Sequence, residues 1–166
     1  MADYGEVMGG MIAALKADAV LTDPATGKLA NYQPDGSPAS RANSIFYTKP
    51  AAVRPEFPCI TVWDIGAAPG LKDQHDEPMG LVRLSVQIDV WGESRQLRAI
   101  QAELDSFLET AARGGSMDTA NWQFNDIDTS GPWRTIALPE EYASADGNPL
   151  EQRSKTFAIL AANKTI

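Results

Sequence analysis

The sequence predicts an α+β domain: a mainly antiparallel β-sheet with two α-helices packed on one face, a long β-hairpin and an extended arm. Two segments carry apolar residues at helical spacings of three and four. Residues 82–90 alternate strictly between apolar and polar, which is typical of a strand with one buried face. Because 166 residues most simply form one domain, we expect a single unit over 1–166.

The first helix, of about 15 residues, is predicted near the N-terminus. Its apolar face would consist of Tyr4, Val7, Met8, Met11, Ile12 and Leu15. Gly9 and Gly10 weaken this helix unless a neighbouring segment needs close approach there.

An arm of weak structural signal follows from Asp18 to Pro58. It is rich in turn signatures such as Asp23-Pro24, and a short apolar patch at 45–47 is either a strand or a tucked-in segment. Long connections in compact domains tend to be functional or disordered. We therefore expect the arm to gain order from contact with something else.

A hairpin is predicted next. Its first strand is the β-rich run CITVW from Cys59, its second is LVRLSVQIDVW from Leu81, and a Gly/Pro-punctuated loop at 66–80 joins them. On the second strand, one side is apolar at Val82, Leu84, Val86, Ile88 and Val90, and the other carries Arg83, Ser85, Gln87, Asp89 and Trp91.

The second helix is predicted to follow Ser94, a plausible N-cap, and to be stopped by Gly114 and Gly115. Its apolar stripe is Leu97, Ile100, Leu104, Phe107, Leu108 and Ala111, which we expect to cover the apolar side of the second hairpin strand. Arg95 and Arg98 lie in its first turn and Asp105 and Glu109 toward its end, against the preference of the helix dipole. Either this is a solvated face or a partner surface offsets the cost.

Three further strands are predicted toward the C-terminus, at 122–127, 133–138 and 156–161. A Ser-Gly-Pro turn separates the first two, and a polar, turn-rich segment separates the last two.

The charge balance limits the function. Acidic residues outnumber basic ones by 22 to 14, giving a net charge of -8, which disfavours gripping nucleic acid or an anionic membrane. No apolar run approaches the roughly 20 residues of a membrane span. The single cysteine, Cys59, and the start MADYGEVMGG indicate a reducing, intracellular compartment, or an assembly built there.

No motif indicates catalysis, a metal or a cofactor. His75 is the only histidine and lies in the charged loop with Lys72, Asp73, Asp76 and Glu77, where nothing orients it as a base. The same cluster matches no calcium loop or zinc site. We interpret it as a solvated acidic loop and expect no enzyme activity.

Two tryptophans are candidates for contact with a partner. Trp63 and Trp91 fall near the ends of the two hairpin strands, and Trp91 shares a side with polar residues. A tryptophan on a polar sheet face either lies over the rim of the sheet or anchors a partner.

The order of these segments resembles a known family. The stretches ALKADAVLTD from Ala14, FPCITVW from Phe57, VRLSVQIDVWGES from Val82 and LRAIQAELDSFLE from Leu97 resemble the tail-terminator, or tail-completion, proteins of long-tailed bacteriophages and gene transfer agents. The resemblance covers roughly 11–110. The arm at 18–58 is longer than the link usual in that family.

The resemblance implies a structural virion protein without a cofactor. Such proteins form a ring, typically hexameric, that caps the head-proximal end of the tail tube, ends its polymerisation and joins the head connector. The implied partners are other copies of the chain, the tail tube protein and a connector or stopper protein. DNA would pass through without specific binding, and the protein would be assembled in the host cytoplasm into the neck of the virion.

Candidate contact residues follow from the two lines of reasoning together. They are Trp63, Trp91, Arg83 and Asp89 on the hairpin strands, Arg95 and Arg98 facing acidic groups of an adjacent subunit, and Lys72, Asp73, His75, Asp76 and Glu77 in the loop. The alternatives are another head-to-tail connector component, either neck or stopper, and a small His75-dependent enzyme.

Overall fold

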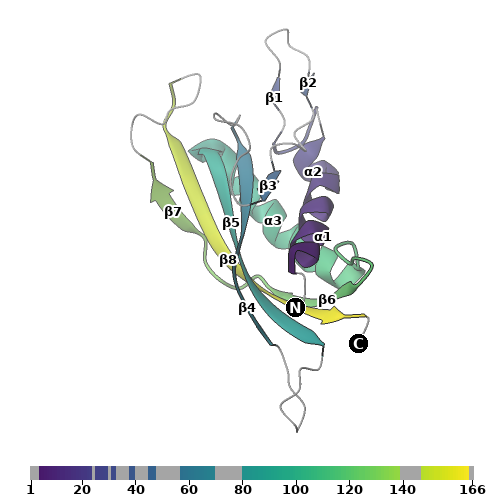
Figure 1. Cartoon of the computed structure of the whole chain (residues 1–166). Coiled ribbons are helices and arrows are strands. Elements are labelled where there is room, and N and C mark those ends of the chain that lie inside the picture. Colours follow the sequence, from purple (N-terminus) through teal and green to yellow (C-terminus); the bar gives the residue numbers. More distant parts are fainter. Residues whose placement is uncertain are drawn as a thin grey trace.

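The computed structural model of the chain has a six-stranded sheet with helices on one face, which confirms the predicted α+β class (Figure 1). It describes residues 4–23, 25–29, 31–32, 38–39, 45–47, 57–69, 80–138 and 147–164. The helices are α1 (Tyr4–Ala17), α2 (Ala19–Thr22) and α3 (Ser94–Gly114). None of the described helices is long and apolar enough to cross a membrane.

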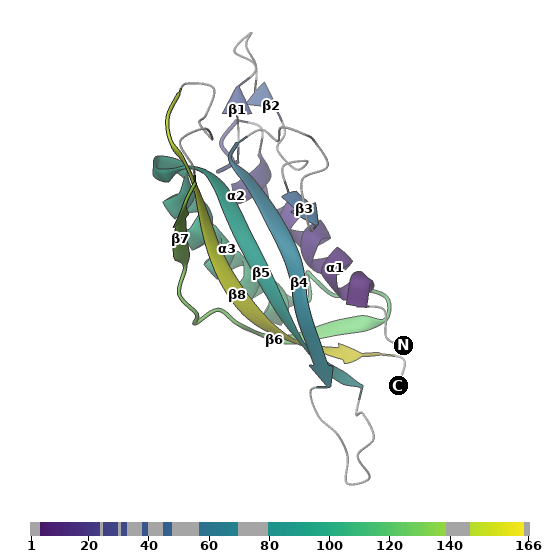
Figure 2. The ribbon, with the colours of Figure 1, turned by 60° about the vertical axis from the view of Figure 1, so that its left-hand side comes forward.

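The sheet is mainly antiparallel, as predicted, and is strongly twisted (Figure 2). Its strands are β3 (Ile45–Tyr47), β4 (Cys59–Pro69), β5 (Leu81–Glu93), β8 (Leu150–Asn163) and β6 (Trp122–Asp128) in that spatial order, with β7 (Arg134–Ala137) also paired to β8. Only β3 and β4 run parallel among these pairs. Separately, β1 (Asn31–Tyr32) pairs with β2 (Pro38–Ala39).

The core lies between β5 and the helices. The five apolar residues of β5 named above are all buried, and Leu97, Ile100, Leu104 and Leu108 of α3 belong to the same cluster. Burying one such side chain contributes roughly 1.5–3 kcal/mol before entropy is subtracted. Phe107, predicted to be part of this layer, is only half-buried and packs against the edge of the core.

The N-cap of α3 is Glu93, so the prediction of Ser94 was wrong by one residue. Glu93 and Gln96 form a capping box, in which the Gln96 side chain accepts from the Glu93 backbone N–H at 3.1 Å. At the other end, Gly115 adopts the left-handed conformation, φ 78°, which terminates the helix as predicted.

Gly10 shows why α1 tolerates glycine. A Cβ at this position would lie 2.4 Å from the carbonyl oxygen of Met117. The helix therefore approaches the segment after α3 more closely than any larger residue permits. The contact is reinforced by Glu6, whose carboxylate accepts from the Thr119 hydroxyl at 2.6 Å and from the Asn121 backbone.

The arm is partly built into the domain, and its first residues form a third helix that was not predicted. Asp18 caps α2 by accepting from the Val20 N–H at 3.1 Å. Leu21, Leu29 and Ile45 are fully or almost fully buried in the core. Leu21 and Leu29 escaped notice because no periodicity connects them, whereas Ile45 belongs to the predicted apolar patch at 45–47, which forms the strand β3.

Two strands are longer than predicted. β4 continues through residues 66–69, which were assigned to the loop, because a bulge between Asp64 and Gly66 lets the pairing with β5 resume. β8 begins at Leu150 rather than Thr156, since its polar first half pairs with both β5 and β7. Residues 70–79 of the predicted loop lie outside the described residues.

Candidate interaction surface

The sheet has two unlike faces. All three helices lie on one face (Figures 1 and 2). We call the opposite face the open face. Strand register places these residues on it: Thr61 and Trp63 of β4, Gln87, Asp89 and Trp91 of β5, Gln152, Ser154 and Thr156 of β8, and Arg134 and Ile136 of β7.

Trp63 and Trp91 converge on one residue of the open face. The indole N–H groups of both donate to the hydroxyl oxygen of Thr61, at 3.3 Å from Trp63 and 2.9 Å from Trp91. Thr61 itself is fully buried, while both indoles are half-buried. The polar atom of each tryptophan is therefore satisfied within the chain, and part of each ring is left exposed.

Asp89 is not a surface residue. Its side chain is only 2% exposed, and its two carboxylate oxygens accept from the Gln87 amide at 2.9 and 3.2 Å. It faces Thr61 on β4 and Ser154 on β8. The Asp89 carboxylate is therefore buried and hydrogen-bonded within the chain and does not offer a charge to solvent.

The other predicted contact residues are scattered. Arg83 is exposed toward the far end of β5, and Arg98 is exposed on α3. Arg95 pairs with Glu93 at 2.8 Å, so the acid at the N-cap offsets the charge that the helix dipole disfavours. Lys72, Asp73, His75, Asp76 and Glu77 lie outside the described residues.

A shallow hollow of about 190 Å³ lies at the β7 side of the open face. Its lining consists of Gln87, Gly131, Pro132, Arg134, Ser154, Lys155 and Thr156. The polar side chains that line it from the open face are Gln87, Arg134, Ser154 and Thr156, so the hollow suits a polar group better than an apolar ligand.

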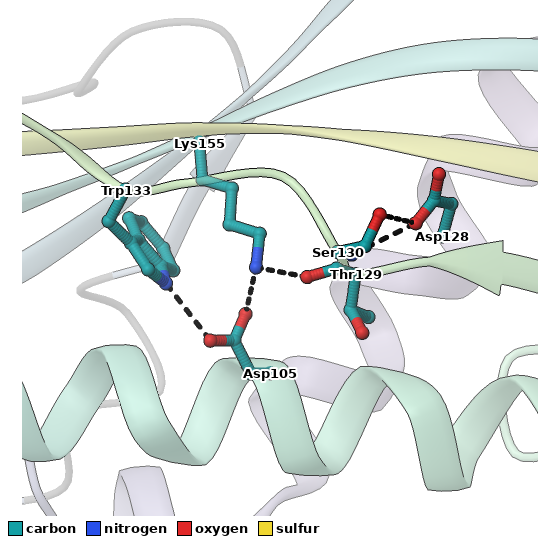
Figure 3. Close-up of polar contacts among 6 residues, drawn as sticks. All are labelled: Asp105, Asp128, Thr129, Ser130, Trp133 and Lys155. Carbon is teal, nitrogen blue, oxygen red and sulfur yellow. Dashed lines mark hydrogen bonds and ion pairs between the residues drawn. The ribbon is translucent and has the colours of Figure 1, made fainter.

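A second tryptophan cluster lies on the helix side of the sheet, around Lys155 (Figure 3). The Lys155 ammonium, 3% exposed, donates to Asp105 of α3 at 2.8 Å and to the Thr129 carbonyl. The Trp133 indole N–H donates to the other oxygen of Asp105 at 3.1 Å. The ammonium also lies 5.0 Å from the centre of the Phe157 ring and 5.7 Å from that of Trp133.

This cluster fastens α3 and the β6–β7 connection to β8. Next to it, Arg153 donates to Gln101 at 2.7 Å, so two basic residues of β8 meet two polar residues one helical turn apart. Sequence reasoning missed the pairing and interpreted Asp105 as a misplaced surface acid. In the sequence, the pairing of β8 with α3 could have been found from Gln101 and Asp105, which lie four residues apart at the margin of the apolar stripe.

Two carboxyl groups meet where α2 and α3 pack. Burial first, then a hydrogen bond and charge repulsion from Asp18, raise the pKa of Glu103 to about 7, while Lys28 acts in the opposite direction. The Glu103 carboxyl is therefore largely protonated below neutral pH. At the β6 end, hydrogen bonds from the Ser130 hydroxyl and backbone lower the pKa of Asp128.

The described residues contain no group of three or more His, Cys, Asp or Glu side chains that could hold a metal ion. Cys59 is buried, 1% exposed. No family model matches the chain, and no curated protein is detectably similar to it. The class that the geometry defines is an α+β domain with one open, tryptophan-bearing sheet face.

Proposed function

We propose that this chain is a structural subunit of a phage-like tail, which assembles into a closed ring at the head-proximal end of the tail tube. The ring would end tube polymerisation and join the tail to the head connector. The protein would thus be a tail terminator built into the virion after synthesis in the host cytoplasm. Its partners would be copies of itself, the tube protein and a connector or stopper protein.

The observation that supports this proposal most is the one-sided covering of the sheet. Helices bury one face, whereas the open face presents the exposed parts of Trp63 and Trp91 around Thr61. Tryptophans with a satisfied N–H and an exposed ring are enriched at protein interfaces. An assembly subunit has a use for such a face, because the exposed ring surface becomes buried on association.

The charge also supports a ring through which DNA passes. A net charge of -8 keeps phosphates from adhering to the subunit. The order helix, arm, hairpin, helix and C-terminal strands agrees with the segments that resemble tail terminators.

The test is the assembly state of the purified chain, measured by native mass spectrometry and electron microscopy, followed by mixing with tail tubes of the same phage. A ring of defined mass that caps only one tube end supports the proposal. Rings that bind the connector and leave tube ends growing would indicate a stopper component instead. A chain that stays monomeric and loses a measurable enzyme activity on His75→Ala would overturn the structural role.

A further inference from the structure

Asp18 has one buried oxygen atom without a hydrogen-bond donor. The residue is only 9% exposed, and its Oδ1 accepts from the Val20 N–H at 3.1 Å as the N-cap of α2. Its other oxygen, Oδ2, is also buried and has no donor in the described part of the chain. A buried carboxylate oxygen without a donor is costly, so a donor from a neighbouring group would stabilise the fold.

Glu103 of α3 can supply this donor. Its side chain is half-buried, faces Asp18 and lies within hydrogen-bond reach of it. Two ionised carboxylates only repel each other, whereas a protonated Glu103 donates its O–H to Oδ2 of Asp18. The charged groups that face Glu103 are Asp18 and, on the segment after α2, Lys28. On α3 itself, the residues three and four positions away carry no charge: Ala99, Ile100, Ser106 and Phe107.

The acid–base behaviour of Glu103 agrees with this bond. Burial first, and then the hydrogen bond with Asp18 and its charge, raise the pKa of Glu103 from 4.5 to about 7, while Lys28 acts in the opposite direction. The proton is therefore held in mildly acidic solution and is lost as the pH passes through neutrality.

The residues after Asp18 form a small unit that the bond connects to α3. The backbone N–H groups of Lys28 and Leu29 donate to the carbonyl oxygens of Val20 and Leu21, at 2.8 and 2.9 Å, so the chain closes on itself. Because α2 has only four residues, its stability comes from packing and from contacts of this kind. A unit this small can open locally while the sheet stays folded.

We propose that Asp18 and Glu103 form a proton-dependent latch, in which a proton shared by the two carboxyl groups holds α2 and the start of the arm against α3. Loss of the proton leaves two carboxylates facing each other, and Lys28 offsets only part of their repulsion. The unit then opens more often. The latch goes beyond the proposed function and does not depend on ring assembly. A partner that contacts the arm would shift the balance between the closed and open forms.

The direction of the pH effect is defined. In the closed form the pKa of Glu103 is about 7, whereas in the open form it returns toward the ordinary value of 4.5. The closed form therefore binds a proton that the open form has released. Opening should become more frequent as the pH rises from about 5 to about 7, and should level off above that.

Amide hydrogen exchange of the whole chain, followed by mass spectrometry and corrected for intrinsic exchange rates, tests the latch. Protection of the peptide that spans 18–29 should fall about tenfold between about pH 5 and about pH 8. At the upper pH this peptide should be much less protected than β5, because it opens on its own.

Two variants isolate the proton. Glu103→Gln keeps a donor for Oδ2 and has no proton to lose, so the protection of 18–29 should become independent of pH. Asp18→Asn keeps an N-cap for α2 but removes the charge, so the midpoint of a carbon-13 NMR titration of Glu103 should fall. Glu109→Gln, at an exposed pair with Arg113 on the same helix, is the matched control and should keep the wild-type profile.

Three results would overturn the latch. The first is a wild-type protection of 18–29 that does not change with pH, and the second is the same pH dependence in Glu103→Gln. The third is equal protection of 18–29 and β5 at every pH, because the segment would then open only with the whole fold. None of these results bears on ring assembly, so the two proposals fail separately.

Discussion

Tryptophan side chains on opposite faces of the same sheet donate their indole N–H groups to different kinds of acceptor. On the helix side, the Trp133 indole donates to Asp105, whose charge is balanced by the buried Lys155. On the open face, Trp63 and Trp91 donate to the uncharged hydroxyl of Thr61. Both clusters satisfy the indole N–H, and only the first contains an ion pair.

The difference follows from what covers each cluster. A buried ammonium must be paired and hydrogen-bonded, and α3 with the β6–β7 connection supplies both. A hydroxyl needs much less, so the open-face cluster can remain half-exposed. The first cluster therefore secures the fold, and the second leaves indole surface for a partner.

Removing Lys155 from its cluster with Asp105 and Trp133 should have the largest effect on the free energy of unfolding. Lys155→Ala removes the partner of Asp105 and the contacts with two rings, and should lower the free energy of unfolding by about 3 kcal/mol in urea denaturation. The double change Lys155→Met and Asp105→Asn should recover most of the loss, because no charge is left unpaired and the amide oxygen can still accept from the Trp133 indole N–H. A loss below about 1 kcal/mol for Lys155→Ala would mean that the pair does not secure the helix.

Breaking the open-face cluster should affect stability less and assembly more. Trp91→Ala should cost about 2 kcal/mol, since the side chain is half-buried, and should abolish ring formation. Thr61→Val keeps the shape but removes the acceptor for both indoles, at about 1 kcal/mol. An unfolded Trp91→Ala chain would place Trp91 in the core instead; circular dichroism with native mass spectrometry distinguishes the two.

The pair Glu103 and Asp18 contrasts with the Lys155–Asp105 ion pair, because it brings two carboxyl groups together instead of opposite charges. The raised pKa of Glu103, about 7, means that the folded chain binds a proton which the unfolded chain releases near 4.5. Stability should therefore fall as pH rises from about 4.5 to 7 and level off above. Glu103→Gln should flatten this profile and stabilise the chain at pH 8 by about 1 kcal/mol after solvent screening. An unchanged thermal denaturation profile would contradict it.

Removing the ion pair of Arg95 with Glu93 should have the smallest effect on stability. The Arg95 side chain is 73% exposed, so Arg95→Ala should change stability by less than about 0.5 kcal/mol. Reversing both Arg95 and Arg98 tests the separate hypothesis that they face acids of an adjacent subunit. Rings that form normally from that double variant would rule the hypothesis out.

Much of the fold could be predicted because the signals were local. The alternation of β5 and the stripe of α3 identified the central strand and the helix that covers it. The first half of β8 could not be predicted, because Arg153 and Lys155 occupy the inward positions where a strand pattern expects apolar residues. Their burial depends on Gln101 and Asp105, about 50 residues earlier in the chain.

The candidate surface was predicted in part. Trp91 was identified as the residue that breaks the polar side of β5, whereas its bond to Thr61, 30 residues away, depends on the register of β4 and β5. The sequence by itself determined the α+β class, the central strand and the main helix, because periodicity is a local property. Only the tertiary structure decided which polar residues are buried and which strands pair, because burial and pairing depend on neighbours distant in the chain.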